Sequence, residues 1–107
     1  EKYEFYGDCF LLIDRKSYSA ASSFASTFQC YRMGTIIGEP TGGKPNHFGE
    51  LKSDVLKNSG LRFTWSVKYF QVTEGDPESI FPDKEVLLNY KDYTEGIDPA
   101  LELIKKL

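Results

Sequence analysis

Cysteine, histidine and long apolar runs are scarce in this sequence of 107 residues, and each scarcity excludes a class of protein. The two cysteines, Cys9 and Cys30, form neither a disulfide framework nor a metal-ligand spacing, so we predict that both are free thiols in the core. No apolar run approaches the roughly 18 residues that a membrane-spanning helix needs. No motif indicates a metal ion or another cofactor.

An excess of positive charge is also absent. Lysine and arginine number 13 against 16 acidic residues, the net charge is −3, and the basic residues are scattered. Nucleic acid is therefore not an expected partner. The length indicates one domain, and it is short for an enzyme with its own cleft, so we expect an incomplete domain. Since the chain begins at Glu1, we expect a processing boundary there, with any export signal upstream.

The clearest pattern predicts a strand, a helix and a second strand. Two short apolar runs, Asp8–Asp14 and Thr35–Gly38, are typical of strands that are covered on both faces. Between them, apolar residues recur at spacings of three and four, which predicts an amphipathic helix that begins at Ser19 and ends at Gly34. Its apolar face consists of Ala20, Ala21, Phe24, Ala25, Phe28 and Tyr31. Together these segments predict a βαβ unit with parallel strands.

In a βαβ unit the carboxyl ends of both strands lie at one edge of the sheet, where α/β proteins usually build their sites. Ser19 and the loop Glu39–Lys44 both fall at that edge. A serine in the first helical turn lies beside unpaired amides, which stabilise a developing oxyanion. The amide of Ala20 is the expected donor, and no second donor is evident. From the helix pattern alone, a plain N-cap is the more frequent role for such a serine.

A serine becomes a good nucleophile only when a base takes its proton, and this edge offers Lys44 and His47. Lys44 would need burial, or the loss of neighbouring acids, to lower its pKa by about three units. A histidine needs no such change but lies deeper in the loop. The loop glycines Gly42 and Gly43 either bring the backbone close to a ligand or form an ordinary turn.

The remainder of the chain predicts a hairpin and a closing helix. One strand of the hairpin alternates polar and apolar residues over nine positions, which predicts a half-buried strand with Trp65 in the core. The predicted segments are the strands Phe48–Leu56 and Leu61–Tyr69, a surface loop Val72–Asp83 with solvated acids, a short edge strand Lys84–Leu88, an irregular segment Asn89–Gly96, and a helix that Asp98 caps and Pro99 begins.

The stretch SYSAASSFASTFQCYRMGTIIGEPTGGK, Ser17–Lys44, resembles the core of the C-terminal processing peptidases, also called tail-specific proteases. In that family a Ser-Ala-Ser-Glu stretch opens a helix, and a GEPTFGKG loop follows the next strand. The resemblance implies that Ser19 is the nucleophile and that Lys44, 25 positions later, is the general base. The segments FPD and DPAL, Phe81–Asp83 and Asp98–Leu101, resemble later features of the family.

Three departures from that family concern the surroundings of the lysine. Ser22 stands where the processing enzymes have Glu, Pro45 follows the lysine in place of Gly, and Phe48 replaces a Gln. The form TGGKPNHFGE is more similar to a divergent, tricorn-related branch, in which a histidine from the upstream part of the domain serves as base. Lys44 would then be a bystander.

The resemblance implies an α/β fold with a ClpP/crotonase-like βαβ core, a β-hairpin and a C-terminal helix. Residues 1–107 would form the C-terminal part of one peptidase catalytic domain, whose upstream part, with or without a PDZ-type domain, lies outside this sequence. The implied activity is that of an exported or cell-envelope serine endopeptidase, which cleaves peptide or protein substrates through an acyl-enzyme on Ser19, with Gly42 and Gly43 in substrate binding. The alternatives are a non-catalytic peptide- or ligand-binding relative and a crotonase-type acyl-CoA enzyme.

Overall fold

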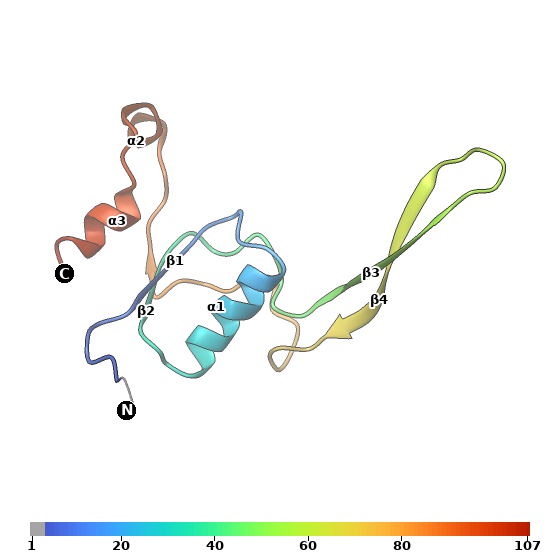
Figure 1. Ribbon diagram of the computed structural model, residues 1–107. Helices are drawn as coiled ribbons and strands as arrows, with labels where there is room; N and C mark the ends of the chain where they lie inside the picture. Colours follow the sequence, from blue (N-terminus) through green and yellow to red (C-terminus); the bar gives the residue numbers. More distant parts are fainter. Residues whose placement is uncertain (1–3) are drawn as a thin grey trace.

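The computed structural model describes residues 4–107 as a small α/β unit from which a long hairpin projects (Figure 1). The extents along the principal axes are 60 × 44 × 32 Å. Along the chain the elements are β1 (Phe10–Ile13), α1 (Ala20–Cys30), β2 (Thr35–Gly38), β3 (His47–Val55), β4 (Arg62–Phe70), β5 (Lys84–Glu85), α2 (Tyr90–Glu95) and α3 (Pro99–Ile104).

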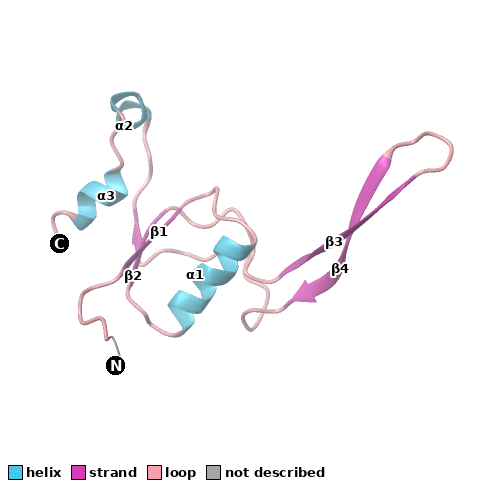
Figure 2. Cartoon of the chain, in the orientation of Figure 1, coloured by secondary structure: helices cyan, strands magenta, loops and turns pink. Residues whose placement is uncertain are grey.

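The parallel sheet has three strands in the order β1-β2-β5. Strand β1 pairs with β2 from Phe10 opposite Thr35 to Ile13 opposite Gly38, and β2 pairs with β5 through Ile37 and Lys84. Helix α1 connects β1 to β2, so the predicted βαβ unit is confirmed (Figure 2). The ends of β1 and β2 therefore place the turn before α1 and the loop after β2 at one edge of the sheet.

The core lies between α1 and the sheet. Its buried cluster consists of Ile13, Ala25, Phe28, Ile36 and Ile80. The apolar face of α1 is narrower than predicted, because Phe24 and Tyr31 are exposed while Ala25 and Phe28 are buried. A sheet of three short strands covers only the side chains that face it directly.

Two predictions at the end of α1 are wrong. The helix ends at Cys30 rather than at Gly34, and the left-handed residue after it is Arg32, with φ 50°. Position 34 needs a glycine for a steric reason instead: a Cβ there would overlap the carbonyl oxygen of Cys9. Both cysteines are free, as predicted, but Cys30 is exposed and Cys9 only partly buried, so neither is a fully buried core thiol.

The hairpin of β3 and β4 forms where the sequence predicts it, but it is not half-buried. Every residue of β4 except Phe70 is exposed, and Trp65, predicted as a core residue, exposes 41% of its surface. Alternation predicts that one face of a strand is covered, yet it does not identify the covering element. Within residues 4–107 no other element covers either face of this hairpin.

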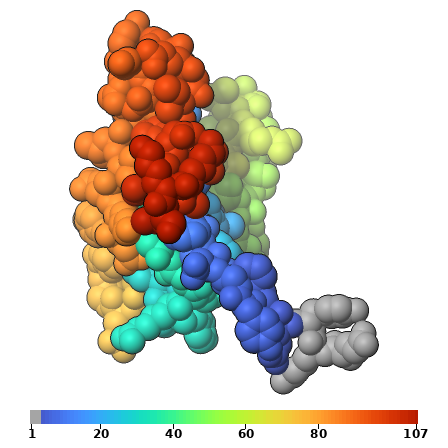
Figure 3. Space-filling view, turned by 90° about the vertical axis from the view of Figure 1, so that its left-hand side faces the viewer, coloured from blue at the N-terminus to red at the C-terminus, as the bar shows by residue number. Residues whose placement is uncertain are grey.

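The C-terminal segment forms two short helices that lie on the face shown in Figure 3. The segment predicted to be irregular contains α2, whose N-cap Asn89 accepts a hydrogen bond from the Asp92 amide at 2.9 Å. It was missed because six residues are too few to show an apolar period. Helix α3 begins at Pro99 as predicted, and Asp98 accepts hydrogen bonds from the amides of Ala100 and Leu101 at 3.0 and 3.1 Å.

Hydrogen bonds of Thr41 link the loop after β2 to the segment that precedes β5. Its side chain is buried, donates a hydrogen bond to the Gly43 carbonyl at 2.8 Å and accepts one from the Ile80 amide at 2.9 Å. The Thr41 amide in turn donates to the Ile80 carbonyl at 3.0 Å. These three bonds fix the loop relative to the core.

We expect Thr41→Val to lower the free energy of unfolding by about 1–3 kcal/mol, because it leaves a buried amide without its acceptor. Thr27→Val is the matched control, since the exposed Thr27 hydroxyl donates only to the Ser23 carbonyl of its own helix, and we expect less than about 0.5 kcal/mol there. Urea unfolding of the full-length variants measures both values. Equal losses for the two variants would contradict the role assigned to Thr41.

Candidate functional site

Ser19 occupies a strained turn between β1 and α1. Its backbone has φ 53° and ψ −118°, and it is one of three non-glycine residues with positive φ in the described chain. Such a conformation costs on the order of 1–3 kcal/mol, and residues of this kind cluster at functional sites. The Ser19 side chain is exposed and makes no capping hydrogen bond to the helix. It therefore does not act as an ordinary N-cap.

The turn that carries Ser19 is held by the carbonyl group of Ser17. This oxygen accepts a hydrogen bond from the buried Ser22 hydroxyl at 3.1 Å and another from the Gly43 amide at 3.1 Å. The Ser17 amide donates to the Asp14 carbonyl at 2.9 Å. The turn is thus fixed both to its own helix and to the loop after β2.

Gly42 and Gly43 allow this loop to approach the turn. A Cβ at Gly42 would overlap the Arg15 carbonyl oxygen, and one at Gly43 would lie 2.7 Å from the Ser22 hydroxyl and 3.1 Å from the Tyr18 Cα. Both glycines are therefore needed for close packing.

Ser19 and Lys44 line one cleft of about 690 Å³, as the sequence-based prediction requires. Phe48 and Tyr69 form an aromatic wall of the cleft, with their ring centroids 4.8 Å apart. The full lining consists of Tyr18, Ser19, Gly42, Gly43, Lys44, Asn46, His47, Phe48, Tyr69, Asp76 and Glu78.

Ala20 is the first residue of α1 and directly follows Ser19. Within residues 4–107 its amide donates no hydrogen bond to a backbone or side-chain acceptor. Amides in the first turn of a helix generally lack an intrahelical partner and lie at the positive end of the helix dipole. This amide is therefore free to donate to an oxygen of a bound molecule.

Lys44 is paired with two carboxylates. Its Nζ lies 2.7 Å from Glu78 Oε1 and 3.1 Å from Asp76 Oδ2. Hydrogen bonds to Glu78 and then to Asp76 raise the pKa of Lys44 above its ordinary value of 10.5, the opposite of the change that a general base needs. The prediction that these acids are simply solvated is therefore incomplete. Because 32 residues separate Asp76 from Lys44, no local pattern indicates the pair.

Asn46, which no sequence pattern indicated, holds the acidic loop beside Lys44. Its buried side chain accepts hydrogen bonds from the amides of Val72 and Thr73 at 2.8 and 3.0 Å. It also donates to the carbonyls of Thr73 and Gly75 at 3.0 and 2.7 Å. A single asparagine in a loop carries no sequence signal for contacts with residues so distant in the chain.

His47 is the first residue of β3 and is partly buried. Its Nδ1 lies 3.0 Å from the Pro45 carbonyl oxygen, and its ring stacks on Phe70 with the centroids 5.6 Å apart. The ring is therefore held from two sides, and His47 lies at the start of a strand rather than deep in the loop, where the sequence placed it.

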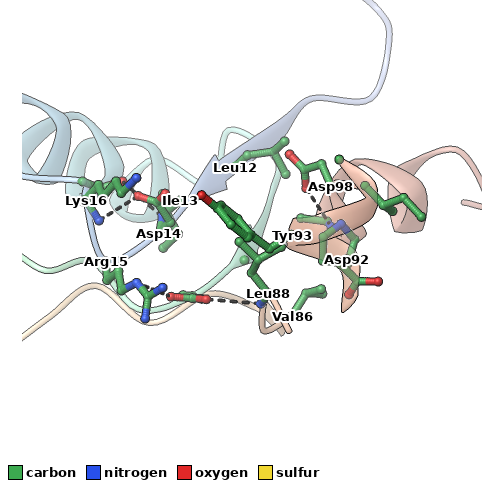
Figure 4. Close-up of a pocket in the computed structure, with 17 residues that line it drawn as sticks. Leu12, Ile13, Asp14, Arg15, Lys16, Val86, Leu88, Asp92, Tyr93 and Asp98 are labelled. Atoms are coloured by element: carbon green, nitrogen blue, oxygen red, sulfur yellow. Dashed lines mark hydrogen bonds and ion pairs between the residues drawn. The ribbon is translucent and has the colours of Figure 1, made fainter. Parts of the chain in front are cut away.

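A second cleft of about 620 Å³ lies at the carboxyl ends of β1 and β2, beneath α2 and α3. Figure 4 shows the ring of Tyr93 lying across it. Glu39 also lines this cleft; it pairs with Arg15 at 3.8 Å and accepts a hydrogen bond from the Leu88 amide at 3.3 Å. In residues 4–107 there is no cluster of three or more potential metal ligands, and no helix is long and apolar enough to cross a membrane.

Comparisons with known proteins identify relatives of this chain. The model of peptidase family S41 matches residues 1–86. A crystal structure of a protein from Parabacteroides merdae, provisionally described as a peptidase, matches with a TM-score of 0.71 and 26% sequence identity over 99% of this chain. The chain spans 33% of the length of that protein. No match was found among curated proteins.

We expect the double variant Asp76→Asn, Glu78→Gln to lower the pKa of Lys44 toward 10.5, whereas Glu74→Gln in the same loop leaves it unchanged. NMR titration of the lysine side-chain signals measures this pKa. Because pairing raises the pKa in the folded state, the ion pairs stabilise the fold below pH 10.5, and this contribution is lost as the pH rises through the raised value. Identical titration curves for the double variant and the unmodified protein would refute the assignment.

Proposed function

Because this chain belongs to peptidase family S41, we propose that residues 1–107 form the C-terminal part of a serine endopeptidase domain. The three-stranded sheet and α1 would belong to a ClpP/crotonase-like core completed by chain outside these residues. The match to only 33% of a longer protein supports this division. The substrates would be peptides or proteins, as the family implies.

The observation that carries the proposal is the geometry of Ser19. Its hydroxyl is exposed in a cleft, makes no capping bond, and stands on a strained turn at the start of a helix. A serine with a purely structural capping role would use its oxygen to satisfy a helix amide. An uncommitted hydroxyl beside the free Ala20 amide suits a nucleophile instead.

In the proposed reaction, the Ser19 oxygen attacks the carbonyl carbon of a peptide bond while its proton passes to a base. The new C–O bond gives a tetrahedral oxyanion, toward which the Ala20 amide donates. The C–N bond then breaks, and the base returns the proton to the leaving amine. Water hydrolyses the remaining ester and restores the serine. The second oxyanion donor would come from elsewhere in the domain.

Two candidates for the base follow from the family resemblance: Lys44, and a histidine outside residues 1–107. Lys44 lies in the same cleft as Ser19, which supports it. Its pairing with Glu78 and Asp76 keeps it protonated, so it would act as a base only after those carboxylates release it. These ion pairs favour a histidine over Lys44.

The substrate would lie between the glycine loop and the aromatic wall of the cleft. Gly42 and Gly43 expose backbone there without side chains, next to the turn of Ser19. Phe48 and Tyr69 are both exposed and offer apolar surface to the side chains of a bound peptide.

Ser19→Ala is expected to abolish covalent labelling of the full-length protein by a fluorophosphonate, because the serine oxygen forms the bond to phosphorus as fluoride leaves. Ser23→Ala, one turn further along α1, is the matched control and should label at the unmodified rate. Gel fluorescence with a tagged fluorophosphonate measures labelling. Undiminished labelling of Ser19→Ala would reject the proposed nucleophile, and the absence of labelling in the unmodified protein would favour a binding role.

Lys44→Ala is expected to retain labelling within about threefold of the unmodified rate, because a lysine held as an ammonium accepts no proton. The same fluorophosphonate assay measures it, with thermal unfolding as the check on folding. A fall of 100-fold or more in a folded Lys44→Ala protein, the size typical of a lost general base, would assign the base role to Lys44.

A further inference from the structure

We infer that the apolar face of the β3–β4 hairpin is an intrachain interface, on which the upstream part of the same catalytic domain packs. This inference rests on the proposed function, in which residues 1–107 are the C-terminal part of that domain. It adds the surface that joins the two parts, and it relates that surface to the cleft of Ser19.

The interface is formed mainly by one row of side chains on β4. Alternation along the strand places Phe63, Trp65, Val67 and Tyr69, the β4 row, on one face and polar residues on the other. The four apolar residues expose between 41 and 48% of their surface. The rings of Phe63 and Trp65 stack with their centroids 5.3 Å apart. At roughly 3.4 Å per residue, the row is about 20 Å long, which is enough to receive a helix or a strand.

Strand β3 adds little apolar surface to this face. Phe48 pairs with Tyr69, whereas Lys52 and Asp54 lie opposite the two outer residues of the row. Residues directly opposite each other in an antiparallel pair share a face, so these charges flank the row on one side. Charged side chains are typical of a strand that stays at the edge of a sheet. The contact is therefore centred on β4, with β3 at its rim.

The length of the hairpin limits the kind of partner that can cover it. Each strand has nine residues, and within residues 4–107 no other helix or strand lies along either face (Figure 1). An isolated two-stranded hairpin is at best marginally stable in water, and an uncovered apolar strand promotes aggregation. A substrate is present only during turnover and would leave the hairpin uncovered between reactions. The cover is therefore a permanent part of the folded protein.

The related structure supports an origin of this cover within the same polypeptide. It matches 99% of this chain, the hairpin included, while this chain spans only 33% of it. About two thirds of that protein's length thus lies outside the match and is available to cover the hairpin. Among residues 4–107, the six buried hydrophobic residues all lie outside the hairpin, so the core described above does not stabilise it.

The same face connects the hairpin to the proposed site. Tyr69, at the inner end of the β4 row, and Phe48 opposite it both line the cleft that contains Ser19. An element that packs along the row therefore ends at the aromatic wall and borders this side of the cleft. Phe63 and Trp65 then position that element and do not contact the substrate.

Photo-crosslinking in the full-length protein tests the inference. The photoreactive amino acid p-benzoylphenylalanine replaces either Phe63, whose ring it extends, or Thr64, which lies on the opposite face of β4. After irradiation and digestion, mass spectrometry identifies the linked peptides. We expect position 63 to link to peptides upstream of Glu1 in the same polypeptide, with a yield at least tenfold above that of position 64.

Hydrogen exchange of the unmodified full-length protein provides a second test that needs no substitution. We expect the β4 amides that pair with β3 to exchange at least 100-fold more slowly than those of an unfolded peptide. The reason is that a covered hairpin opens only when its interface separates. Mass spectrometry of peptides from β4 measures the exchange.

Three cross-linking results would overturn the inference: links between two copies of the chain, links confined to residues 1–107, or a yield at position 63 no higher than at position 64. Exchange of the β4 amides at the rate of an unfolded peptide would overturn it as well. The proposed nucleophile fails separately, because only normal fluorophosphonate labelling of Ser19→Ala rejects it, whatever the cross-links show.

Discussion

The arrangement of the site depends on one carbonyl oxygen, that of Ser17, which binds the glycine loop and the first helical turn together. It accepts hydrogen bonds from the Gly43 amide and from the Ser22 hydroxyl. The first bond needs the close approach of the loop that Gly42 and Gly43 allow. The resulting contact places Lys44 and Ser19 in one cleft. It also fixes both ends of the turn in which Ser19 adopts its strained backbone, so the energy of packing maintains a conformation that the serine alone would not keep.

The two basic side chains of the cleft, Lys44 and His47, have different partners. The loop that Asn46 anchors brings Asp76 and Glu78 to Lys44, which makes the lysine a fixed cation rather than a proton acceptor. The same asparagine precedes His47. The His47 ring is oriented by the Pro45 carbonyl, and no described charged residue forms an ion pair with it. The segment around Asn46 thus sets both the ion pairs of Lys44 and the orientation of the His47 ring.

Local patterns of the sequence predicted the βαβ unit, the hairpin strands and the start of α3, because each depends on periodicity or capping within a few residues. The same patterns failed where the outcome depends on distant chain. The Lys44 ion pairs and the Asn46 hydrogen bonds join residues 26 or more positions apart, and no local pattern encodes them. Trp65 was placed in the core because alternation predicts a covered face, whereas residues 4–107 supply no cover for it. The strain at Ser19 was also invisible, since a serine before a helix is typical of an ordinary cap.

The central claim is that the Ser19 oxygen forms the covalent bond to a substrate carbonyl. Mass spectrometric mapping of the protein after reaction with a fluorophosphonate tests this most directly, because it identifies which residue is modified and needs no substituted variant. The account predicts a single stoichiometric adduct on the peptide that contains Ser19. An adduct on Ser17, Ser22 or any other residue, with Ser19 unmodified, would contradict it.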